Sequence, residues 1–190
     1  MSLEKYFTHF RKNIVGRDQT FNSPYGEQKI LYADWIASGR MYKEIEDKLK
    51  EEVFPFVANT HTETSTTGAT MSIAFHEALK IIKKHVRAND NDVIISAGAG
   101  MTMLVSKFQR ILGLKVHEKF NKFIEVLNPP VVFVTHMEHH SNQTSWLETI
   151  AEVKLIPHHS SGEIDLISFR KLLKKYKERE VKIAAVTSCS

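Results

Sequence analysis

Two loops of this sequence hold residues whose types and spacing could do chemistry. The first, residues 96–102, reads Ser-Ala-Gly-Ala-Gly-Met-Thr and follows a short apolar run. Small residues let a ligand approach the backbone closely, and the free amides at a helix start favour an anion. The loop therefore suits a phosphate, and a tight turn without a ligand is the alternative. The dinucleotide pattern GxGxxG fails because Met103 stands where the third glycine would be, and no Walker-type Gly-Lys-Ser/Thr follows.

The second loop, residues 136–142, reads His-Met-Glu-His-His-Ser-Asn and also follows an apolar run. An imidazole here could stack on a flat heteroaromatic cofactor. Alternatively, His136, Glu138 and His139 could bind zinc and serve a metal-dependent hydrolase, since histidine and glutamate are good zinc ligands. The HExxH spacing of zinc peptidases is absent, however. A purely structural role is the third alternative.

A third loop, residues 187–190, contains the single cysteine, Cys189. One cysteine excludes an internal disulfide and a CxxC-type zinc site, and it suits a reducing compartment. Because a lone cysteine is more often a small packing residue than a nucleophile, we expect that role for Cys189.

Apolar periodicity predicts the elements that position these loops. Asp165 can cap the helix that follows it, and Gly113 is placed to end another. The predicted helices cover residues 3–14, 42–53, 70–87, 104–112, 139–151 and 165–176, and the predicted strands cover residues 30–33, 92–96, 131–135, 153–157 and 182–187.

The alternation of strands and helices from residue 92 onward predicts an α/β fold. We expect three layers, with a mainly parallel sheet covered by helices on both faces. Ligands bind such sheets beyond the carboxyl ends of the strands, where all three loops lie. The last predicted strand ends next to Ser190, so we expect the chain to be part of a longer domain.

Composition narrows the class of protein. The 190 residues are 42% hydrophobic and 25% charged, as in a soluble globular protein. The net charge of +4 comes from scattered lysines and arginines, which argues against a nucleic-acid partner. No apolar run approaches the roughly 20 residues of a membrane span, and the first residues lack a signal-peptide core. We therefore expect a cytoplasmic protein without membrane contact.

Several segments, in order, resemble motifs of the class V aminotransferase family of pyridoxal-phosphate (PLP) enzymes. The most specific is Glu138-His139-His140-Ser141-Asn142 with Trp146, which is similar to the E-H-H-x-N-x-x-x-W segment of the cysteine desulfurase and selenocysteine lyase branch. The others are Tyr32 to Ala37 (Y-x-D-x-x-A), Ala58 to His61 (A-N-x-H), the phosphate-binding turn at 93–102, the G-x-(I/L)-D link at 160–165, and the strand at 186–190 that leads to S-N-x-x-G.

The resemblance implies an incomplete fold-type I large domain. Residues 1–28 would be an N-terminal helix and lead-in, and residues 29–190 the first half of the PLP-binding domain. The rest of that domain and a C-terminal small domain would be absent. The Schiff-base lysine, the aspartate on the pyridine nitrogen and the desulfurase cysteine lie further along such chains, so we expect these 190 residues alone to be inactive.

The resemblance also assigns roles to particular residues. His139 would stack on the pyridine ring, while Gly98, Ala99, Gly100 and Met101 would bind the phosphate through backbone amides. Desulfurase relatives often carry two threonines where this chain has Ala99 and Gly100, so hydroxyl contacts would be lost. The substrate would contact Ala37, Asn59 and His61, with the last two reaching across a homodimer.

The implied reaction begins with imine formation between PLP and an amino acid, with the ring as electron sink. Desulfuration and transamination both remain open, and a sulfur-acceptor protein is a further expected partner. A metal-dependent hydrolase and a non-catalytic α/β binding module are the competing hypotheses.

Overall fold

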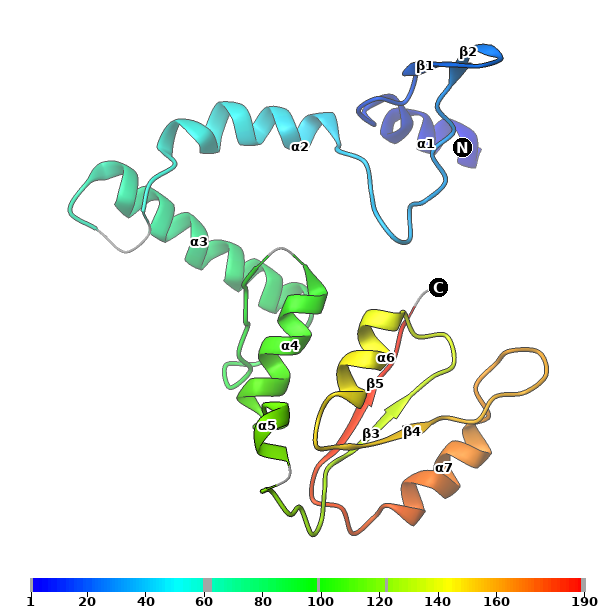
Figure 1. Cartoon of the computed structure of the whole chain (residues 1–190). Helices are drawn as coiled ribbons and strands as arrows, with labels where there is room; N and C mark the ends of the chain where they lie inside the picture. The colour runs from blue at the N-terminus through cyan, green and yellow to red at the C-terminus, as the bar shows by residue number, and fades with distance from the viewer. Residues whose placement is uncertain (1, 60–62, 99, 122, 189–190) are drawn as a thin grey trace. The chain divides into compact units, whose positions relative to one another are not determined.

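The computed structural model describes residues 2–59, 63–98, 100–121 and 123–188. They form two compact units, Met1–Ile94 and Ile95–Ser190 (Figure 1). The predictions made for His61, Ala99 and Cys189 lie outside the described residues. The predicted domain boundary at residues 28/29 stays a prediction.

The second unit is built on a parallel sheet of three strands in the order β4-β3-β5 (Figure 1). The strands are β3 (Val131–Val134), β4 (Glu152–Leu155) and β5 (Lys182–Ala185). Val132 lies opposite Val153 on one side and Ile183 on the other. The strands predicted near 131, 153 and 182 are therefore confirmed.

Helices cover both faces of this sheet. Val132 and Val134 pack with Leu114 and Trp146 in one core cluster, to which α4 (Met101–Ile111) and α6 (His140–Leu147) contribute. Val131 and Phe133 point the other way and pack with Ile156, Tyr176 and residues of α7 (Leu166–Lys175). All four β3 residues are buried because both faces are covered, which is typical of parallel strands. The predicted three-layer α/β architecture is confirmed.

The strand order explains this division of the helices. From β3 the chain moves to β4 on one side, and from β4 it returns past β3 to β5 on the other. Right-handed crossovers in opposite directions place their helices on opposite faces, here α6 and α7. The connections that leave β3 and β4 therefore run to opposite faces of the sheet.

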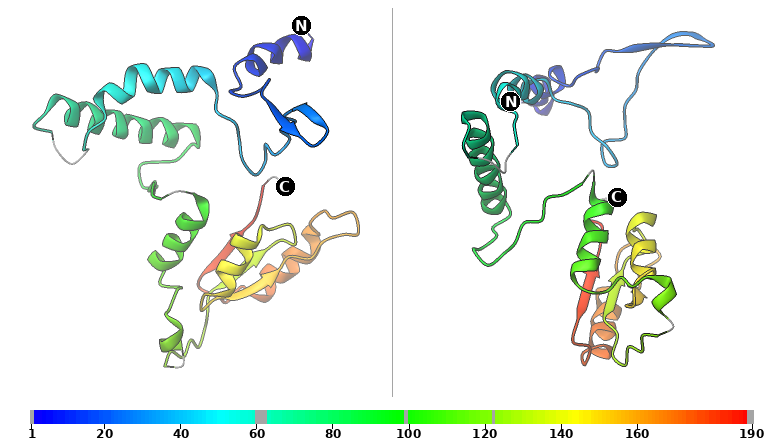
Figure 2. Two further views of the ribbon diagram at one scale, coloured as in Figure 1. Left: turned by 45° about the horizontal axis from the view of Figure 1, so that its top comes forward. Right: turned by 60° about the vertical axis from the view of Figure 1, so that its left-hand side comes forward.

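The first unit is mainly helical and carries one hairpin. Figure 2 shows α3 as one uninterrupted helix. The elements are α1 (Leu3–Lys12), β1 (Thr20–Ser23), β2 (Gly26–Lys29), α2 (Lys43–Lys48), a π-helical turn (Leu49–Val53), a 3-10 turn (Phe54–Phe56) and α3 (Thr66–His85); the short α5 (Glu118–Asn121) belongs to the second unit.

Two predicted strands are wrong. Residues 30–33 and 92–96 belong to none of the described strands, and Val93 is 82% exposed. An apolar run shows a preference for burial, yet a strand also needs a neighbouring backbone to pair with. The predicted helix at 42–53 is α-helical only to Lys48. It continues as the π-helical turn and then as the 3-10 turn that contains Pro55, which cannot donate a backbone hydrogen bond.

None of the described helices is both long and apolar enough to cross a membrane.

Candidate functional site

A pocket of about 500 Å³ lies at the carboxyl edge of the sheet, within the second unit. This volume is in the range of small-molecule and cofactor sites, about 300–1,000 Å³. Residues along α4, α6 and β5 and of the segment that follows β5 form its wall, which includes Met101, Thr102, Val105, His139, Trp146 and Thr187.

The start of α4 lines this pocket. Gly100 is the N-cap residue, and no side chain caps the helix there. The first amides of an α-helix have no partner within the helix, and with the helix dipole they favour an anion. Met101 and Thr102, which carry the first of these amides, line the pocket.

The turn before α4 requires glycine at two positions. Gly98 has φ +67° and Gly100 has φ +149°, both in the region that side chains disfavour. A Cβ at Gly98 would also overlap the sulfur of Met103, whereas a Cβ at Gly100 would meet open space. Glycine at these two positions therefore allows the backbone path that leads into α4.

His139 is the N-cap residue of α6 and lies in the pocket wall. Its Nδ1 atom accepts a hydrogen bond from the Ser141 amide at 3.2 Å and lies 2.7 Å from the Ser141 hydroxyl. Because Nδ1 accepts, the neutral ring carries its proton on Nε2. The cap holds the imidazole in one orientation.

Glu138, the neighbour of His139, is buried and accepts four hydrogen bonds. The donors are the Thr135 hydroxyl (2.5 Å), the Asn142 side-chain amide (2.7 Å), and the Thr187 backbone amide and hydroxyl (2.9 and 2.8 Å). Burial opposes ionisation of Glu138, but the hydrogen bonds from Thr135, Thr187 and Asn142 outweigh it, so its pKa lies below the ordinary value. The carboxylate stays charged and joins the end of β3 to the end of β5.

Asn142 extends this network into the core. Its side-chain oxygen accepts a hydrogen bond from the Trp146 indole at 3.0 Å, while its amide donates to Glu138. Asn142 and Trp146 are four residues apart on α6 and so share one helix face. The E-H-H-x-N-x-x-x-W spacing thus connects the loop carboxylate to a buried tryptophan.

Sequence reasoning missed two members of this arrangement. Thr135 and Thr187 were not assigned roles, although Thr135 directly follows β3 and Thr187 lies two residues beyond the end of β5. That position, with a hydroxyl in place of an apolar side chain, is the signal that could have identified them.

The zinc alternative is not supported by the geometry. The Glu138 carboxylate is occupied by its four donors, and the His139 Nδ1 caps α6. His136 instead stacks on His158, with ring centroids 3.9 Å apart. Within the described part of the chain, no three histidine, cysteine, aspartate or glutamate side chains are placed to hold a metal ion.

The residues predicted to contact the substrate belong to the first unit. Ala37 is exposed in a turn that the Ser38 amide closes onto the Asp34 carbonyl at 3.0 Å. Asn59 is also exposed, and His61 lies outside the described residues. Their roles stay predictions.

Comparison with curated proteins finds no significant match. The family model for aminotransferase class-V matches residues 31–190, which is most of the chain and includes the pocket described above. The parallel sheet with helices on both faces agrees with that match. The chain therefore belongs to the aminotransferase class-V family.

Proposed function

We propose that this protein is a PLP-dependent enzyme that acts on an amino acid. One observation carries the proposal: a single pocket of about 500 Å³ is lined on one side by the start of α4 and on another by the His139 imidazole. The first suits a phosphate group, and the second suits the face of an aromatic ring. Membership of the aminotransferase class-V family supports the same cofactor.

The residues of the pocket fit a phosphorylated pyridine. In this proposal Gly98, Ala99, Gly100 and Met101 form the phosphate-binding turn, and they act through backbone amides. His139 presents its ring to the pyridine, in the orientation that its hydrogen bond with Ser141 holds. The chemistry that PLP supplies when bound is an electron sink for bonds at the α-carbon of the substrate.

The remaining residues position this pair. Glu138 holds the turn that carries His139 against the end of β5, through both polar groups of Thr187. Ala37, Asn59 and His61 are proposed to contact the amino-acid substrate, with Asn59 and His61 reaching across a cytoplasmic homodimer.

Within the family, we place this chain nearest to the cysteine desulfurase and selenocysteine lyase branch. The E-H-H-x-N-x-x-x-W segment supports this placement, and in the structure Glu138, Asn142 and Trp146 form one continuous hydrogen-bonded network. A sulfur-acceptor protein would then be a further partner. Transamination is the alternative, and conversion of L-cysteine to alanine rather than to a 2-oxo acid, by the longer PLP-loaded protein that the resemblance implies, would distinguish the two.

Binding of pyridoxine 5′-phosphate tests the cofactor site. This compound lacks the aldehyde, so it cannot form imines with surface lysines. Calorimetry should show it binding at least about tenfold more tightly than pyridoxine, because only the phosphate can use the start of α4. His139→Ala should weaken binding about two- to tenfold, as loss of an aromatic contact of roughly 0.5–1.5 kcal/mol predicts.

His117→Ala is the matched control, since His117 also lies in the second unit but outside this pocket. It should leave the affinity unchanged. Equal affinities for pyridoxine and its phosphate, or equal effects of the two histidine variants, would contradict the proposed site.

A further inference from the structure

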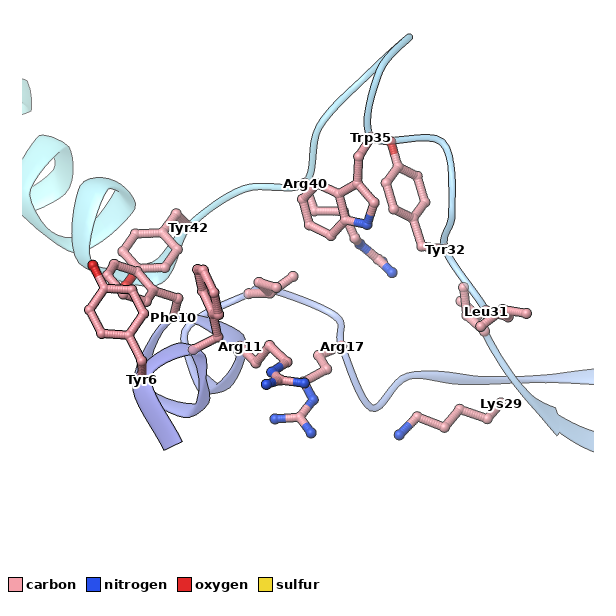
Figure 3. Close-up of a pocket in the computed structure, with 13 residues that line it drawn as sticks. Tyr6, Phe10, Arg11, Arg17, Lys29, Leu31, Tyr32, Trp35, Arg40 and Tyr42 are labelled. Carbon is pink, nitrogen blue, oxygen red and sulfur yellow. The ribbon is translucent and has the colours of Figure 1, made fainter. Parts of the chain in front are cut away.

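A second, larger cavity lies within the first unit and is not explained by the proposed PLP site. It has a volume of about 1,030 Å³ and is bounded by α1, the end of β2 and residues 30–42 (Figure 3). Its lining combines aromatic rings with arginine and lysine side chains.

The aromatic residues form two exposed clusters. On α1, the rings of Tyr6, Phe7 and Phe10 pack against one another with centroids 4.9–6.2 Å apart. On the opposite wall, Trp35 meets Tyr32 edge to face at 5.2 Å and is 49% exposed. Exposed rings gathered around a hollow mark a ligand-binding or interaction surface.

The charged residues that line the cavity are all basic: Arg11, Arg17, Lys29 and Arg40. Figure 3 labels these four residues around the cavity. The neighbouring carboxylates compensate only part of this charge.

Glu4 pairs with Arg11 at 2.9 Å, and Asp18 pairs with Lys29 at 2.6 Å and lies 3.9 Å from Arg17. Arg40 has no carboxylate within 4.0 Å among the described residues and lies over the Tyr32 ring, 5.1 Å from its centroid. The cavity therefore carries excess positive charge beside an aromatic wall.

Backbone contacts hold these walls together. The Val15 amide donates to the Met41 carbonyl at 2.9 Å, and the Lys43 amide donates to the Asn13 carbonyl at 2.8 Å. Arg40 packs closely over Gly16, where a Cβ would lie 2.6 Å from the guanidinium nitrogen. The position of Arg40 in the wall thus follows from the pairing of two chain segments.

We infer that this cavity binds a planar aromatic anion, such as an aryl carboxylate or aryl phosphate. The rings supply faces for the aromatic body, and the uncompensated guanidinium of Arg40 supplies a bidentate, charge-assisted contact for its acidic group. The inference stands independently of the proposed PLP chemistry, because every residue that carries it lies in the first unit. A small molecule is favoured over a protein segment because the site is concave and close in volume to known small-molecule pockets.

Calorimetric titration with 2-naphthoate and with the uncharged 2-naphthamide tests this site. In low salt the naphthoate should bind at least about tenfold more tightly, since the two probes differ mainly in charge. Arg40→Gln should remove most of this preference and leave naphthamide binding unchanged, and Arg40→Lys should restore part of it. Lys84→Gln removes a cation of the same unit that does not line the cavity, and it should change neither affinity.

Trp35→Ala should weaken both probes, because both use the aromatic wall. Equal binding of the two probes, or a naphthoate preference that survives Arg40→Gln, would overturn the inference. Concentration-dependent self-association that Trp35→Ala abolishes would also overturn it, by showing that a second copy of the chain occupies the cavity. Circular dichroism of each variant confirms that the comparison is between folded proteins.

Discussion

The Glu138 carboxylate accepts hydrogen bonds from both polar groups of Thr187, the backbone amide at 2.9 Å and the hydroxyl at 2.8 Å. The two residues are far apart in the sequence, yet they lie at the ends of adjacent strands, because β3 and β5 pair in parallel. This contact joins the loop that carries His139 to the opposite wall of the candidate site. Its removal should affect the site and the stability of the second unit together.

Glu138→Gln should lower the free energy of unfolding of the second unit by about 1–3 kcal/mol. The substitution removes the buried charge that accepts four hydrogen bonds, and it places a side-chain NH2 group against the donors from Thr135, Asn142 and Thr187. Urea unfolding followed by the fluorescence of Trp146 measures this. The chain has two tryptophans, so the Trp35→Phe background isolates the signal. Glu148→Gln changes an exposed glutamate at the C-terminal end of α6 and should be close to neutral. Equal stability of the two variants would contradict the bridging role.

Acid should destabilise the second unit in part through Glu138. Because its folded-state pKa is depressed, its contribution is fully present above the unfolded-state pKa of about 4.3 and is lost as the pH falls through the lower folded-state value. Stability measured from pH 6 down to pH 2 should therefore fall less steeply in Glu138→Gln than in the native protein. Parallel curves would show that Glu138 does not contribute to the acid dependence.

Gly98→Ala should destabilise the protein more than Gly113→Ala. The two glycines have nearly equal φ angles, +67° and +69°, so both variants pay a backbone cost of roughly 1–3 kcal/mol. Only at Gly98 would the added methyl also overlap Met103. The comparison of unfolding midpoints isolates the overlap, and Met103→Ala should partly rescue Gly98→Ala. Equal losses in the two alanine variants would contradict it.

Asp165→Ala should cost about 0.5–2 kcal/mol, as is usual for loss of a helix N-cap. Its carboxylate accepts from the Ile167 and Ser168 amides, both at 3.0 Å, at the start of α7. Asp165→Asn should retain most of the stability, because asparagine caps equally well. A larger loss in the asparagine variant than in the alanine variant would count against the cap.

Phe133→Ala should cost about 3–5 kcal/mol, the usual range for a fully buried phenylalanine. Phe133 is 1% exposed and lies edge to face with Phe169 and Tyr176, at 5.6 and 6.0 Å. Phe21→Ala is the control, because Phe21 is 51% exposed in the hairpin. Thermal unfolding compares the two, and a small loss for Phe133→Ala would place the core elsewhere.

Local patterns were sufficient to predict much of the second unit. The uninterrupted apolar run at β3 indicated a strand buried on both faces, and Asp165 marked the start of a helix because its carboxylate satisfies amides two and three residues away. The same kind of evidence failed at residues 92–96 and 30–33, where apolar character was present but no described strand lies alongside. Capping is a short-range interaction, whereas strand pairing needs a partner from elsewhere in the chain.

Residue types and spacing alone predicted the α/β class, the two loops that follow β3 and β5, and the ordered motifs of the class V family. Which side chains meet at those loops depends on contacts between distant parts of the chain. Thr187 reaches Glu138 because parallel pairing brings strand ends together across 49 residues, and His136 stacks on His158 because β4 lies beside β3. The aromatic and basic side chains around Arg40 likewise come together only because residues 13–15 pair with residues 41–43. Residue types and periodicity encode local conformation and burial, but long-range packing sets the distances on which binding and catalysis depend.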